Sequence, residues 1–164
     1  MSKKTLVIGL GNPILSDDGA GIYVAREIKK RRKGLSNIAI IETSQGGIGL
    51  IDLMAGYERV IIVDSIKTAN DTPGKFYRLR VGDLGDITYP CGPHFLDVRT
   101  AVELGSKFGY SMPGTIDIYA IEITDNTTFS ENLTPEVEKG IPLLAEQIIE
   151  DLKEKNELLT PSSL

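Results

Sequence analysis

The order of apolar and polar positions predicts a chain of alternating strands and helices. Five short runs suit strands: Thr5–Leu10, Asn37–Glu42, Arg59–Asp64, Lys75–Val81 and Thr115–Ile123. The first three are almost continuously apolar and are separated by helical patterns, which indicates parallel strands covered on both faces. The fourth is charged and partly alternating and follows a turn sequence, so we expect it at an edge of the sheet.

Helical spacing fills most of the gaps between these runs. Apolar positions recur at helical intervals over Gly21–Ile28 and again over Phe95–Gly105. A last helix is predicted to open at Thr134-Pro135, a cap residue followed by a first-turn proline. Its predicted buried face consists of Val137, Ile141, Leu144, Ala145, Ile148 and Leu152.

The length of 164 residues suits one domain, predicted over 1–155, with a polar tail over 156–164. The formal charge of −5 is too mild to indicate binding to nucleic acid or to an anionic membrane, which favours a small ligand or a protein partner. The basic run Lys29–Lys33 falls where the first helix should end, and cations there suit the helix dipole. No apolar segment has secretory or transmembrane length, so we expect a cytoplasmic protein, and we expect a monomer.

Acidic residues and the single histidine stand at the ends of predicted strands or at the start of predicted helices. Asp17 and Asp18 follow the first strand, Asp64 closes the third, and His94 precedes a helix. Because the carboxyl ends of parallel strands line the ligand crevice of an open α/β sheet, these side chains could converge. Carboxylate and imidazole ligands suit zinc or nickel, and three protein ligands leave coordination positions open.

Simpler interpretations of the same residues stay open. Ser16–Asp18 could cap the first helix, and His94 could be a capping or packing residue. The dinucleotide-binding fingerprint fails, because Gly9–Ile14 lacks its third glycine. Cys91, the single cysteine, could act as a nucleophile only if His94 were its base.

Taken together, these motifs resemble those of the hydrogenase maturation endopeptidases, which trim the C-terminal extension of the large subunit of nickel–iron hydrogenases after nickel insertion. The markers are the glycine-rich and acidic segment Gly9–Gly19, the strand-terminal Asp64, the Pro93-His94 step and the late Leu133–Glu136. The resemblance implies a three-layer α/β/α fold with a twisted, mostly parallel five-stranded sheet and one antiparallel edge strand.

The resemblance also implies the site. The nickel-binding and catalytic residues correspond to Asp18, Asp64 and His94, with Asp17 the less favoured member of the acidic pair. Nickel would arrive in the partner, a large-subunit precursor, and zinc or cadmium could replace it. Whether the metal assists the chemistry or only tethers the substrate stays open.

Substrate contact in the family is associated with an Asp-Gly-Gly-Thr-like loop after the second strand. This chain departs from that pattern, and the corresponding substrate-binding residues are Glu42, Gly46 and Gly47. Cleavage is implied just after the histidine or arginine of a Cys-x-x-Cys-x-x-His/Arg motif in the precursor. Two other functions remain as alternatives: a nickel-binding chaperone without enzymatic activity, and a small-molecule metallohydrolase.

Overall fold

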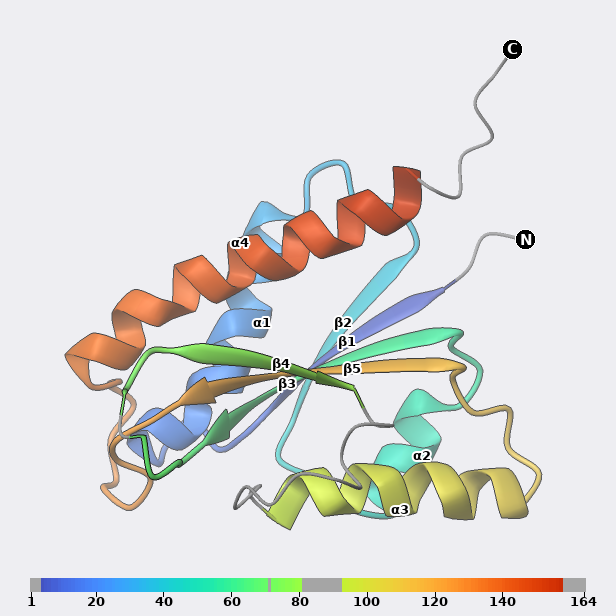
Figure 1. The fold of residues 1–164 in the computed structure, drawn as a ribbon, viewed down its shortest axis with the longest axis horizontal. Helices are drawn as coiled ribbons and strands as arrows, with labels where there is room; N and C mark the ends of the chain where they lie inside the picture. The colour runs from blue at the N-terminus through green and yellow to red at the C-terminus, as the bar shows by residue number, and fades with distance from the viewer. Residues whose placement is uncertain (1–3, 71, 81–92, 158–164) are drawn as a thin grey trace.

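The computed structural model describes residues 4–70, 72–80 and 93–157. A five-stranded sheet lies between two layers of helices (Figure 1). The strands, in chain order, are β1 (Thr5–Leu10), β2 (Ile38–Thr43), β3 (Arg59–Ile66), β4 (Phe76–Arg80) and β5 (Thr115–Glu122). Their spatial order is β2-β1-β3-β5-β4, and all neighbours are parallel except β4, which pairs antiparallel with β5 at one edge.

The helices divide between the two faces of the sheet. One face carries α1 (Ala20–Arg31) and α4 (Pro135–Glu157), and the other carries α2 (Gly49–Met54) and α3 (Pro93–Lys107) (Figure 1). A short 3₁₀ helix, η1 (Ser16–Gly19), joins β1 to α1. Among the described residues no helix is long and apolar enough to cross a membrane.

The core has two halves because successive strand residues point to opposite faces. Ile61 and Tyr119 pack with α1 and α4, whereas Ile62 and Ile118 pack with the α2 and α3 layer. The six positions predicted for the buried face of the last helix are all buried, between 0% and 7% exposed.

Most of the predicted architecture is confirmed, including the parallel pairing of the first three strands and the antiparallel edge strand. The second strand was wrongly expected to be covered on both faces: β2 forms the other edge of the sheet, and all six of its residues are only partly buried. Strand ends shift by one or two residues, and Val81, the predicted end of the fourth strand, lies outside the described residues. Helix α4 extends through Glu157, two residues past the predicted domain end, and 158–164 lie outside the described residues. Helix α2 was not predicted, because six residues are too few for a periodic pattern.

Helix α1 packs unusually close to the sheet through Gly9 and Gly21. A Cβ atom on Gly9 would lie 2.6 Å from the carbonyl oxygen of Gly21 and 2.7 Å from the Cβ atom of Ala25. A Cβ atom on Gly21 would overlap the carbonyl oxygens of Leu10 and Val63. The start of α1 therefore lies directly on the carboxyl ends of β1 and β3.

Candidate functional site

Asp64 lies near the carboxyl end of β3 with 3% of its surface exposed. It alternates with Ile62 and Ile66, so its side chain belongs to the face covered by α2 and α3. Its Oδ1 atom accepts a hydrogen bond from the Ser65 N–H group at 2.8 Å, but its Oδ2 atom is buried without a hydrogen-bond partner. A buried carboxylate oxygen left in this way is costly and calls for an explanation.

The surroundings of Asp64 disfavour its charged form. Burial raises the pKa of Asp64 to about 8, the Ser65 N–H group opposes this rise, and the negative charge of Asp18 adds to it. Perturbed carboxylates of this kind are concentrated at functional sites.

Asp18 reaches this end of the sheet from η1, where it is partly exposed. Its Oδ2 atom accepts a hydrogen bond from the backbone N–H of Asn12 at 2.9 Å. Gly11 allows this hydrogen bond to form. Its φ is 147°, and a Cβ atom at this position would overlap the carbonyl oxygen of Asp18.

Asp17 has a different environment although it directly precedes Asp18 in the chain. It is fully buried and its carboxylate accepts hydrogen bonds from four donors. The donors are the N–H groups of Thr124 (3.1 Å), Asp125 (3.0 Å) and Thr134 (2.7 Å) and the Thr134 hydroxyl (2.8 Å). Asp17 thus fastens the β5–α4 loop, and the capping interpretation is wrong, since neither η1 nor α1 has a side-chain cap.

His94 lies in the first turn of α3, and its side chain is not among those described. Helix α3 covers the face of the sheet to which the Asp64 side chain belongs, and it begins toward the end where β3 and β5 finish (Figure 1). Cys91 lies outside the described residues. Within the described part of the chain, no three His, Cys, Asp or Glu side chains gather as a metal site.

Of the predicted substrate-binding residues, Glu42 lies on β2, and Gly46 and Gly47 follow it. The Glu42 carboxylate pairs with Arg26 at 3.1 Å and Lys29 at 3.6 Å, both on α1. It is therefore directed to the face opposite Asp64, and the structure does not bring these two carboxylates together. Gly46 and Gly47 lie between β2 and α2, and Gly47 has a φ of 61°.

Sequence reasoning missed another buried carboxylate at this end of the sheet. Glu122 closes β5, is 1% exposed, and lies on the same face as Asp64 by its register in the sheet. The hydroxyls of Thr68 and Tyr77 donate to it, the latter at 2.8 Å. Burial acts to raise the pKa of Glu122, but these hydrogen bonds outweigh burial and hold it below its ordinary value. The available signal was the position of Glu122 at a strand end, as for Asp64.

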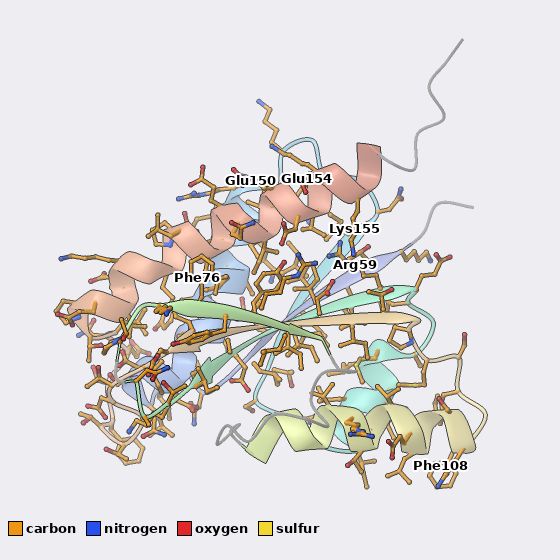
Figure 2. All side chains as sticks on the ribbon, in the orientation of Figure 1. Arg59, Phe76, Phe108, Glu150, Glu154 and Lys155 are labelled. Carbon is orange, nitrogen blue, oxygen red and sulfur yellow. The ribbon has the colours of Figure 1, made fainter. Side chains whose placement is uncertain are left out.

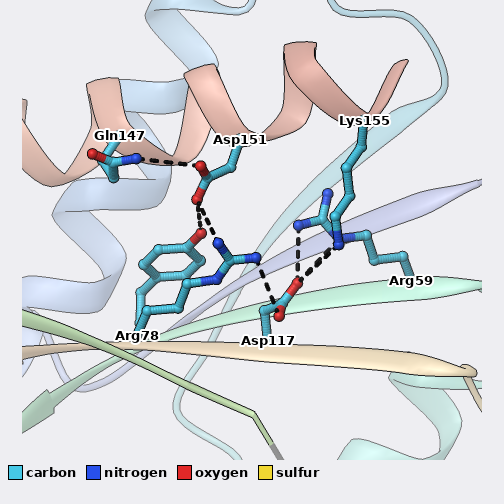
Figure 3. Close-up of polar contacts among 7 residues, drawn as sticks. Arg59, Arg78, Asp117, Gln147, Asp151 and Lys155 are labelled. Atoms are coloured by element: carbon cyan, nitrogen blue, oxygen red, sulfur yellow. Dashed lines mark hydrogen bonds and ion pairs between the residues drawn. The ribbon is translucent and has the colours of Figure 1, made fainter. Parts of the chain in front are cut away.

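A network of charges around the buried Asp117 and Arg59 lies under α4, toward the end where β3 and β5 begin (Figure 2, Figure 3). Asp117 pairs with Arg59 at 2.9 Å, with Arg78 at 3.5 Å and with Lys155 at 3.9 Å. Burial acts to raise the pKa of Asp117, but the Arg59 hydrogen bond and the surrounding cations outweigh it and lower the pKa. Arg78 also pairs with Asp151, at 3.5 Å. This network is fully partnered and structural.

Comparison with known proteins agrees with this architecture. The family model described as "HycI: Hydrogenase maturation protease" matches residues 22–151. The hydrogenase 2 maturation protease of Escherichia coli (strain K12) is 27% identical over 155 residues, covering 92% of each chain. The solved structure of hydrogenase maturating endopeptidase HybD from E. coli has a TM-score of 0.75 and 24% identity, covering 93% of each chain.

HybD, a [NiFe] hydrogenase maturation protease from Thermococcus kodakarensis, has a TM-score of 0.70 and 21% identity, covering 91% of this chain and 98% of its own. At these identities the solved structures support the fold, and the family model supports the activity. The chain belongs to the hydrogenase maturation protease family and is a peptidase.

Proposed function

We propose that this peptidase removes the C-terminal extension of a nickel–iron hydrogenase large-subunit precursor after nickel insertion, and that Asp18, Asp64 and His94 contact the nickel in that substrate. The observation that carries the proposal is the Oδ2 atom of Asp64, which is buried without a hydrogen-bond partner. A cation is the natural partner for such an oxygen. The adjacent negative charge of Asp18 strengthens the attraction for a cation.

The chemistry of the donors fits nickel. Two carboxylates and one imidazole suit divalent first-row metals, and three protein ligands leave positions for groups of the substrate. Zinc or cadmium would serve as surrogates in a binding experiment.

Hydrolysis adds water across the peptide C–N bond, so the oxygen goes to the acyl carbon and a proton reaches the leaving amine. A nickel ion close to the scissile carbonyl would polarise it or lower the pKa of the attacking water. Asp18 and Asp64 are the carboxylates we assign to proton uptake and orientation of the substrate. Glu42, Gly46 and Gly47 are assigned to contact with the precursor away from the nickel.

We also propose that the protein acts as a monomer in the cytoplasm. The single cysteine among 164 residues fits a reducing compartment. A monomer leaves the carboxyl end of the sheet open to a protein substrate.

The test compares nickel-loaded with nickel-free precursor, both purified, at equal enzyme concentration. We expect the loaded form alone to be shortened on a gel, with mass spectrometry of the released peptide giving one cleavage position. Asp64→Asn and Asp18→Asn should abolish cleavage, while Asp52→Asn, which changes an exposed carboxylate on α2, should cleave normally. Cys91→Ser should also cleave normally.

Each alternative predicts a different outcome. Equal cleavage of both precursor forms would refute nickel recognition. Stable binding of the loaded precursor without cleavage would favour the chaperone function. A loss of cleavage in Cys91→Ser, with folding and metal binding intact, would indicate a thiol protease.

A further inference from the structure

We infer that Ile14 and Phe129, here called the rim pair, form an apolar anchor that docks into a hollow on the folded surface of the precursor. This inference rests on the proposed function and adds the surface by which the substrate is held. Both side chains are exposed, Ile14 by 48% and Phe129 by 82%. Aromatic side chains, phenylalanine included, are enriched at protein interfaces.

The two loops that carry the rim pair are joined to each other. The Ser16 N–H group donates to the Ser130 carbonyl at 2.8 Å, and the Ser130 N–H group donates to the Ile14 carbonyl at 2.9 Å. Leu15 and Ser130 form an isolated parallel bridge. The rim pair therefore belongs to one hydrogen-bonded unit although its members are far apart in the chain.

The loop around Phe129 is also held on both sides. Asp17 accepts from Thr124, Asp125 and Thr134, which bracket the loop. Within it, the Oδ1 atom of Asp125 accepts from the N–H groups of Thr127 at 2.9 Å and Thr128 at 3.0 Å. Phe129 is thus presented on an ordered backbone, which lowers the entropy cost of binding.

The rim pair is continuous with the candidate site. The loop that carries Ile14 also supplies the Asn12 N–H group that holds the Asp18 carboxylate. The β5–α4 loop lies beyond the carboxyl ends of β3 and β5 (Figure 1). A protein whose scissile bond reaches Asp18 and Asp64 must lie against these loops, whereas a second copy of this chain docked there would close the site.

A matched control is available at the other end of the molecule. Phe108 is 72% exposed and follows α3, far from the carboxyl ends of the strands (Figure 2). Phe108→Ser removes the same side chain as Phe129→Ser, so a general loss of apolar surface affects both variants equally.

The experiment measures binding of nickel-loaded precursor by calorimetry and its cleavage by steady-state kinetics. Phe129→Ser should weaken binding and raise KM about tenfold or more, with kcat at saturation unchanged within about twofold. Ile14→Ser should have a smaller effect in the same direction. Phe108→Ser should match the wild type, and Phe129→Leu should retain most of the affinity. Circular dichroism checks that each variant is folded.

The outcomes separate this inference from the proposed function. Cleavage by the wild type with equal KM in Phe129→Ser and Phe108→Ser would overturn the docking inference and leave the function standing. Phe129-dependent binding without cleavage would support docking and refute the proposed function. Absence of both binding and cleavage would overturn both, and a wild-type dimer that Phe129→Ser dissociates would overturn docking in favour of self-association.

Discussion

Replacing Asp64 with asparagine should stabilise the folded protein at neutral pH while it abolishes cleavage. Asparagine keeps the shape of the side chain and its acceptor for the Ser65 N–H group, but it carries no charge. In the wild type, burial raises the pKa of Asp64 from 3.8 to about 8. The protein must therefore either bury a charge or take up a proton when it folds above pH 4.

The sign and size of the effect follow from proton linkage. Between pH 3.8 and about 8, the folded state holds a proton on Asp64 that the unfolded state has lost. The wild-type free energy of unfolding therefore falls by about 1.4 kcal/mol per pH unit through this window. Asparagine does not titrate, so Asp64→Asn should gain about 3 kcal/mol over the wild type at pH 6, roughly 2.2 units above the ordinary value.

Urea unfolding followed by circular dichroism at pH 4, 5, 6 and 7, with a chelator present, measures this difference. We expect it to be near zero at pH 4 and to grow with pH. Glu122→Gln is the control, because the Glu122 pKa is lowered, so its charged form stabilises the fold above its ordinary value of 4.5. That variant should be destabilised at pH 7, with a penalty that shrinks as pH falls. A pH-independent difference for Asp64→Asn would refute the argument.

Three further outcomes follow from the same structure. Asp117→Asn should lower the free energy of unfolding by about 3 kcal/mol or more, because it removes the negative charge that neutralises the buried Arg59, and a loss below about 1 kcal/mol in urea unfolding would contradict this. Asp17→Ala should lower the free energy of unfolding by about 3 kcal/mol and increase amide hydrogen exchange in the β5–α4 loop; unchanged exchange there would show that Asp17 does not fasten that loop. Titration calorimetry with nickel or zinc should show one site per chain, and His94→Ala should lose most of the affinity; undiminished binding would remove His94 from the ligand set.

The sheet could be predicted from the sequence because its signals are local. Continuous apolar runs identify β1 and β3 as inner parallel strands, and the charged, alternating run of β4 identifies an edge. Helix α2 could not be predicted, since its six residues are placed by packing against β1 and β3 rather than by periodicity.

The different environments of Asp17 and Asp18 could not be predicted from the sequence. The N–H groups that donate hydrogen bonds to Asp17 come from residues more than one hundred positions later in the chain. No local sequence pattern could therefore predict them. The backbone N–H group that holds Asp18 comes from a loop whose closure depends on the positive φ of Gly11. Tertiary contacts, and not residue type, separate these two adjacent carboxylates.

The buried carboxylates of this fold differ in one physical respect. Asp17 and Glu122 are surrounded by hydrogen-bond donors and Asp117 by cations, so the carboxylate of each has partners. Among the described residues, Asp64 has the one buried side-chain oxygen without a partner, and it also faces the negative charge of Asp18. The other buried acids described here have partners, but this oxygen has none. Its burial without a partner therefore lowers the stability of the fold. Such a position is expected where a ligand supplies the missing partner, and this is why Asp64, rather than the better-bonded carboxylates, identifies the site.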